Sequence, residues 1–196
     1  MRVNLVLLVS IFYLWANISI AYEETSYRIL AANQIYEIRE YDDRLAVQTS
    51  QENGQNRAFR KLFKYISGSN LSSTKIEMTI PVTQSIKIDM TTPVTQKFQD
   101  GKIIMRFFLP RKFQLETAPQ PLSEDLSITV VKGGKYAVMK YSGRSTVKNF
   151  EKHSKLLLEA LSVNKITTLD DPIKATFNGP LTPFFVRRNE VMIRIK

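Results

Sequence analysis

The sequence predicts one α+β domain: a distorted antiparallel β-barrel with two flanking helices and a pseudo-twofold internal repeat. Short segments with alternating apolar and polar residues dominate the chain, as is typical of half-buried antiparallel strands. Two longer segments show the apolar spacing of helices instead. Strand and helix residues recur in the same order 91 residues later, which indicates one unit used twice.

Residues 1–21 are expected to be an export signal rather than part of the fold. After one basic residue, residues 3–15 form an uncharged and mostly apolar run, and Ser19 and Ala21 are small residues suited to a cleavage site. The run is shorter than the ~20 residues that a membrane-spanning helix needs. We expect a secreted or periplasmic mature domain of residues 22–196, with an uncleaved anchor as the alternative.

Two hairpins are expected in the body of the chain. Their strands are residues 36–39 and 45–49, and residues 128–131 and 136–141. The turn-prone pair Asp42-Asp43 joins the first two strands, and Gly133-Gly134 joins the other two. Each strand is therefore expected to pair with its neighbour in the sequence.

Two further strands are expected at residues 103–109 and 191–195. Apolar residues occupy every second position in both segments. In the first, Arg106 lies on the face opposite Met105 and Phe107, as a half-buried strand requires.

Helices are expected at residues 56–67 and 147–162. In the first, an apolar stripe follows helical spacing at Phe59, Leu62, Phe63 and Ile66. Ser145 or Thr146 is suited to cap the second helix. Ala46 and Ala137, and Phe59 and Phe150, share the 91-residue offset, so residues 36–84 and 128–195 are expected to form equivalent halves.

The composition excludes several classes of function. The chain has no cysteine, which excludes disulfides, iron–sulfur clusters and a thiol nucleophile. With His153 as the single histidine, no zinc site is expected. No hydrolase or phosphate-loop motif is present, so we expect no enzyme activity. The formal net charge of +10 favours anionic partners such as carboxylates, phosphates or lipid headgroups.

Five segments carry recognisable motifs: residues 36–41, 59–66, 75–84, 105–110 and 187–191. Together they resemble the SOUL family of heme-binding proteins, over roughly residues 27–196. The motif Met-Thr-x-Pro-Val at Met78 recurs at Met90, which looks like the exported bacterial branch of the family. The resemblance implies a distorted β-barrel with two helices, tetrapyrrole binding in an apolar cleft beside the first helix, and no catalysis.

The first helix offers what a heme site requires. Heme needs apolar wall area and cations near its two carboxylates, and the helix carries both. The predicted binding residues are Phe59, Arg60, Lys61, Leu62, Phe63, Lys64 and Met78. The open alternative is that the apolar stripe is core and the cations form a solvated face.

No histidine ligand to the heme iron is expected. In family members that ligate iron through histidine, that residue matches the position of Glu40, and glutamate is a poor substitute for imidazole. His153 falls on the apolar side of the second helix, where a packed histidine is expected. The predicted cofactor is therefore non-covalent heme without histidine ligation, and another tetrapyrrole stays open.

The expected partner is heme or a similar hydrophobic, anionic small molecule, bound by a monomer. Nucleic acid is not expected, because the basic residues are scattered and an export signal is expected. The alternatives are a general binder of hydrophobic ligands, or a module that contacts membranes or proteins. Peripheral membrane contact stays open.

Overall fold

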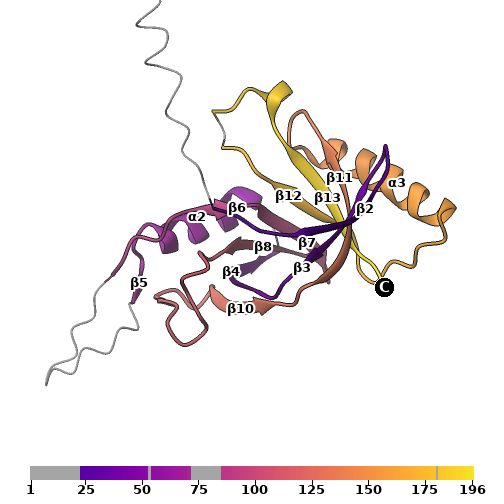
Figure 1. The fold of residues 1–196 in the computed structure, drawn as a ribbon. Coiled ribbons are helices and arrows are strands. Elements are labelled where there is room, and N and C mark those ends of the chain that lie inside the picture. The colour runs from indigo at the N-terminus through magenta and orange to yellow at the C-terminus, as the bar shows by residue number, and fades with distance from the viewer. Residues whose placement is uncertain (1–22, 53, 72–84, 180) are drawn as a thin grey trace, which may run out of the picture.

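A computed structural model describes residues 23–52, 54–71, 85–179 and 181–196 (Figure 1). In these residues a sheet of nine strands runs in the order β10-β4-β8-β7-β12-β13-β11-β3-β2, and all neighbouring strands are antiparallel. The strands are β2 (Arg28–Ala32), β3 (Glu37–Tyr41), β4 (Arg44–Gln51), β7 (Val94–Gln99), β8 (Lys102–Phe108), β10 (Ser127–Val131), β11 (Gly134–Tyr141), β12 (Ile173–Thr176) and β13 (Asn189–Arg194).

Helices α2 (Gln55–Ile66) and α3 (Val147–Val163) lie on the outer side of the curled sheet (Figure 1). Both begin and end within one or two residues of the predicted limits. The Thr146 hydroxyl caps α3 by accepting the N–H of Asn149 at 3.2 Å, as expected from the sequence. The remaining short elements are β1 (Glu23–Glu24) beside β6 (Thr91–Thr92), β5 (Asn70–Leu71) beside β9 (Gln120–Pro121), and the 3₁₀ turn η2 (Phe184–Val186).

The predicted α+β class is confirmed, and the sheet is a strongly curled half-barrel. Its strand order is symmetric about the β7–β12 pair, with β8 matching β13, β4 matching β11 and β10 matching β3. Helix α2 packs on β4 and β8, and α3 packs on the matching strands β11 and β13. The two helices therefore occupy equivalent places, as the predicted repeat requires.

The two predicted hairpins are wrong, because the halves exchange strands. β3 pairs with β11 rather than β4, and β10 pairs with β4 rather than β11. Arg44 faces Val131 and Tyr41 faces Gly134, so one register continues through both expected turns. Residues 37–48 and 127–138 thus form a continuous two-stranded ribbon that passes from one half of the molecule to the other.

Gly133 makes this crossing possible. A Cβ atom at this position would lie 2.2 Å from the carbonyl oxygen of Tyr41 and 2.6 Å from the carbonyl carbon of Asp42. The Asp43 carboxylate accepts the N–H of Gly133 at 2.8 Å and pairs with Lys132 at 2.7 Å. The glycine that suggested a hairpin turn is instead required by the close approach of two backbones.

The predicted 91-residue offset is wrong for the strands, because it matches residues on opposite faces of β4 and β11. Val47 packs in the cluster under α2, and Met139 packs in the cluster under α3. Ala137 faces α3, whereas Ala46 faces away from α2 because strand neighbours alternate. An odd offset exchanges the two faces of a strand, so the matched alanines are not equivalent.

Each half has its own core beneath its helix. One cluster joins α2 to β4, β7 and β8 through residues such as Leu62, Val94 and Phe107, and a second joins α3 to β11 and β13. A third cluster, of Tyr136, Val138, Ala175 and Met192, lies on the inner face of the sheet. The concave side of the half-barrel is therefore partly filled rather than open to water.

Candidate functional site

The outer face of α2 carries an exposed aromatic residue. Phe63 is 49% exposed and stacks on Phe59, with ring centroids 6.1 Å apart and planes 14° from parallel. Phe59 in turn contacts the buried ring of Phe107 edge-on at 5.3 Å. The exposed ring is thus anchored on the core and offers a flat apolar surface to a ligand.

The predicted cations lie on the same helix as this ring, although they are not all equally free. Arg60 and Lys64, one helical turn apart, are both exposed. Lys61 donates to the carboxylate of Asp125 at 2.7 Å, so its charge is already partly compensated. Leu62 is fully buried in the core cluster under α2, behind this face. Met78 lies outside the residues that the structure describes.

Glu40 and His153 lie away from the face of α2. Glu40, on β3, forms an ion pair with Arg28 of the edge strand β2. The His153 ring stacks on Tyr141 at 4.2 Å, and its Nδ1 lies 2.7 Å from the carbonyl oxygen of Asn149. His153 is therefore packed beneath α3, as its place in the sequence indicates. The described residues contain no cluster of three or more acidic or histidine side chains able to hold a metal ion.

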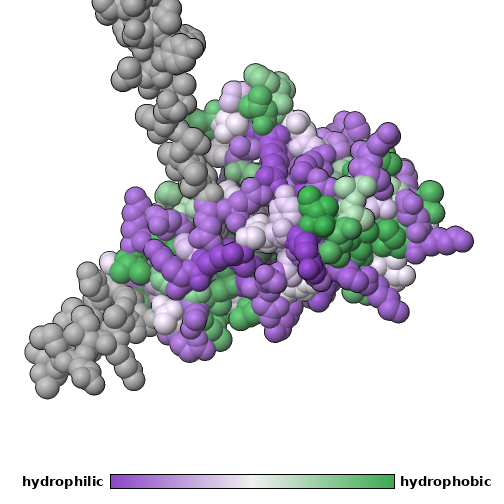
Figure 2. All heavy atoms as spheres, viewed as in Figure 1, coloured by the Kyte–Doolittle hydropathy of each residue, from purple (hydrophilic) through white to green (hydrophobic). Residues whose placement is uncertain are grey.

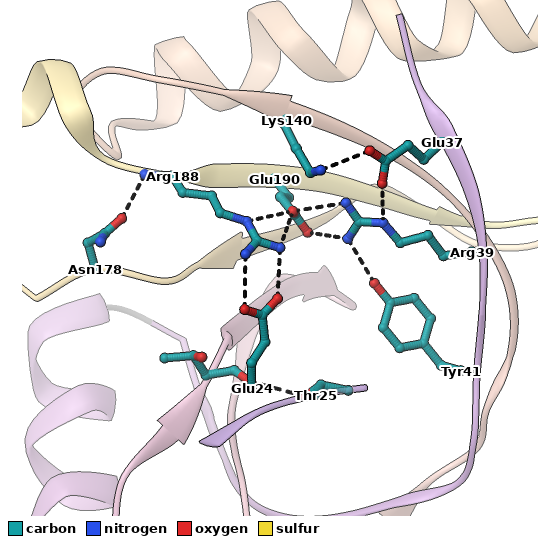
Figure 3. A network of polar contacts seen from close by, with 10 residues as sticks. Glu24, Thr25, Glu37, Arg39, Tyr41, Lys140, Asn178, Arg188 and Glu190 are labelled. Carbon is teal, nitrogen blue, oxygen red and sulfur yellow. Dashed lines mark hydrogen bonds and ion pairs between the residues drawn. The ribbon is translucent and has the colours of Figure 1, made fainter. Parts of the chain in front are cut away.

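Two of the sequence motifs meet in a polar network on the inner face of the sheet (Figure 3). The fully buried Arg39 of β3 donates to Glu190 of β13, also fully buried, at 2.9 and 3.2 Å. Glu37 accepts from Arg39 at 2.7 Å, and Arg188 bridges Glu190 and Glu24 at 2.8 Å. The motif residues Arg39 and Glu190 thus join β3 to β13 across the intervening strand β11, a structural role that the sequence motifs did not disclose.

A pocket also lies on this inner face, beside the network. Its cavity volume is about 50 Å³, and the pocket is partly open to solvent. Its walls come from strands throughout the sheet and include a set of apolar and aromatic side chains: Tyr41, Pro93, Phe108, Val131, Tyr136, Ile173 and Met192. Three cations, Arg44, Arg106 and Lys132, line it together with the single acidic residue Asp42.

Arg44 is the unusual member of this lining. Its side chain is only 8% exposed, and neither terminal nitrogen makes a hydrogen bond with any described residue. The nearest carboxylate oxygen, on Glu23, lies 3.9 Å from one of them. Burial lowers the pKa of Arg44 below its usual value, a shift that Glu23 opposes and Arg111 reinforces. A buried guanidinium whose terminal nitrogens make no hydrogen bond is costly, so this position requires an explanation.

Sequence reasoning did not identify this pocket. Arg44 and Arg106 occupy the polar positions of alternating strands, which in a flat sheet face water. The curl of the sheet instead turns that face inward. The one available signal was the presence of arginines on two strands that the structure pairs, β4 and β8.

Apolar side chains are also exposed at the tip that carries η2. Figure 2 shows hydrophobic atoms gathered where this turn projects from the molecule. Phe184, Phe185 and Val186 are each about half exposed or more. Within the described residues, no helix has the length and apolar character needed to cross a membrane.

The curled sheet, two outer helices and hollowed inner face define an α+β protein of the two-repeat half-barrel class. The sequence model of the SOUL heme-binding protein family matches residues 22–194. The chain belongs to this family, as its motifs suggested. None of the curated proteins matches the chain significantly.

Solved structures share the fold at low sequence identity. A hydrolase from Listeria innocua aligns over 85% of this chain and 94% of its own, with a TM-score of 0.57 and 7% identity. The C-terminal domain of EcmrR aligns over 87% of this chain and 98% of its own, with a TM-score of 0.51 and 9% identity. At such identities the likeness concerns the fold alone.

Proposed function

We propose that the protein binds heme or a related tetrapyrrole on the outer face of α2 and catalyses no reaction. Family membership suggests the ligand class. The observation that carries the proposed location is the half-exposed Phe63, stacked on Phe59, with Arg60 and Lys64 exposed on the same helix.

The chemistry of this face suits a porphyrin. The flat ring of the ligand covers Phe63, and removing apolar area from water contributes roughly 25 cal/mol per Å² before association costs. Arg60 and Lys64 pair with the two propionates at a solvent-exposed rim, where each contact contributes ~1 kcal/mol or less. Lys61 contributes less, because it already pairs with Asp125. No histidine ligates the iron, since His153 is packed against Tyr141.

A spectral titration with hemin tests the apolar part of the proposal. The wild-type protein is expected to sharpen the Soret band at about one equivalent. Phe63→Ala should weaken binding at least tenfold with little loss of stability, because half of the ring is already exposed. Leu156→Ala, which truncates an exposed apolar residue on α3, is the matched control and should leave the affinity unchanged. Equal affinities of all three proteins would place the ligand elsewhere.

A pair of double variants tests the charged part. Arg60→Ala with Lys64→Ala should weaken hemin roughly tenfold, or ~1.4 kcal/mol, and should flatten the salt dependence. Lys148→Ala with Lys152→Ala removes two exposed charges at the same spacing from α3. Both double variants have the same net charge. A similar loss of hemin affinity in both would therefore indicate only long-range attraction between the protein and the anionic ligand.

We further propose that the protein acts after export, as a monomer, with residues 1–21 removed. N-terminal sequencing of protein from its native host tests this, and an intact Met1 would contradict it. The exposed side chains of η2 support an accompanying contact with membrane surfaces, which sedimentation with anionic vesicles would detect.

A further inference from the structure

We propose that the concave pocket around Arg44 is a second ligand site, which takes a small organic anion with an aromatic or aliphatic body. This site differs from the α2 face in place and in chemistry. Along β4, Arg44 shares the inner face with Ala46, whereas Leu45 and Val47 pack towards α2. The sheet itself therefore separates the two sites.

The absence of hydrogen bonds at the Arg44 guanidinium is the first argument. Arg44 is more than nine-tenths buried, and both of its terminal nitrogens lack a hydrogen-bond partner among the described residues. Glu23 does not supply one, since its closest oxygen is 3.9 Å away and accepts the backbone N–H of Arg111 at 3.2 Å. A guanidinium presents a fork of N–H donors that matches a carboxylate, sulfonate or phosphate. The missing partner is an anion.

The surrounding charge is the second argument. Arg106 lies in the same pocket and makes one hydrogen bond within the described chain, from Nε to the side-chain oxygen of Gln48 at 2.9 Å. Lys132 also lines the pocket and pairs with Asp43. Because Asp43 compensates Lys132, the lining has two other cations, Arg44 and Arg106, against the single acidic residue Asp42, an excess that favours an anion over a cation.

The walls indicate the rest of the ligand. Tyr41 and Tyr136 meet edge-to-face at 5.6 Å, and Phe108 lies below the Arg44 guanidinium at 5.4 Å. Ile173 and Met192 close the far side. An inorganic ion would leave these apolar surfaces uncovered, whereas an anion with a compact apolar body covers them and pairs with Arg44 at the same time.

A matched pair of probes isolates the charge. Naphthoate and naphthamide have the same ring system and differ in their carboxylate and amide groups. The wild-type protein should bind naphthoate at least tenfold more tightly than naphthamide, and amide NMR shifts should centre on Tyr41, Tyr136 and Met192. Hemin should not displace naphthoate, because the two ligands occupy opposite faces of the sheet. Equal affinities, no binding of naphthoate at millimolar concentration, or shifts centred on α2 would each overturn the proposal.

Arg44→Met then separates a binding role from a structural one. If Arg44 binds an anion, the variant loses the preference for naphthoate over naphthamide. Without ligand, the variant then unfolds at the same temperature as the wild-type protein or at a higher one. If Arg44 is structural, the variant unfolds at a lower temperature and keeps the preference. If the Arg44 variant does not fold, Arg106→Gln provides a second test. It should reduce the preference for naphthoate over naphthamide severalfold. Lys148→Ala with Lys152→Ala is the control for net charge and should change nothing.

Discussion

Glu190→Gln tests how much the buried network contributes to stability. The substitution keeps the size of the side chain and removes the charge that pairs with Arg39 at 2.9 Å and with Arg188 at 2.8 Å. Removing one partner of a buried ion pair typically costs about 3–5 kcal/mol. Arg39 keeps Glu37 at 2.7 Å and Tyr41 at 3.1 Å, and Arg188 keeps Glu24. We therefore expect a loss at the lower end of that range, ~3 kcal/mol.

Denaturant and thermal unfolding measure this loss. For a chain of this size, ~3 kcal/mol corresponds to a melting temperature lower by roughly 6–12 °C. Glu40→Gln is the matched control on the same sheet: it removes an ion pair with the largely exposed Arg28 and should cost less than about 1 kcal/mol. If the two variants lost equal stability, the burial of Arg39 and Glu190 would not determine the strength of the network. The double variant Arg39→Met with Glu190→Leu should lose less than the two single losses combined, because neither charge is then left unpaired.

Two further predictions follow from the sheet. Gly133→Ala should lower the free energy of unfolding by more than ~3 kcal/mol or prevent folding, because its Cβ would lie 2.2 Å from the Tyr41 carbonyl oxygen. Gly179→Ala is the control: its Cβ would have no atom within 4 Å, so the same unfolding assay should show almost no change. Burial alone would raise the pKa of Glu37, but hydrogen bonds from Lys140 and Arg39 lower it overall. The lowered pKa adds stability above the unfolded value of about 4.5 that is lost as the pH falls through the folded pKa. Glu37→Gln should therefore flatten the acid side of a stability–pH curve, and an unchanged slope would contradict this assignment.

The elements of the fold were predictable, but their pairing was not. A strand or helix with one buried face has apolar residues at regular intervals along its length. The sequence shows this pattern at residues 103–109, with the period of a strand, and at residues 56–67, with the period of a helix. Pairing depends on where two strands meet in space. Asp42-Asp43 and Gly133-Gly134 have the residues of tight turns, yet a backbone crossing selects the same residue types. Local sequence does not distinguish the two outcomes.

The predicted site residues divide according to the face of the helix they occupy. The stripe from Phe59 to Ile66 correctly marked an apolar face, but only the structure separates the buried Leu62 from the exposed Phe63. Likewise, Lys61 and Lys64 look alike in the sequence, and the pairing of Lys61 with Asp125 depends on a loop 64 residues away. The binding role of these residues remains a prediction. The concave pocket left no comparable pattern, because its walls come from strands scattered through the chain.

The exchange of strands between the halves has a consequence for how the chain reaches its native state. About 75 residues separate β4 from its partner strand β10, and the separation of β3 from its partner β11 is longer still. Such distant pairings carry a large loop-closure entropy and are typical of slowly folding proteins. An isolated first half would also leave β4 with an unpaired edge, a surface prone to aggregation. The repeat is therefore a symmetry of the finished molecule, and neither half is an independent folding unit.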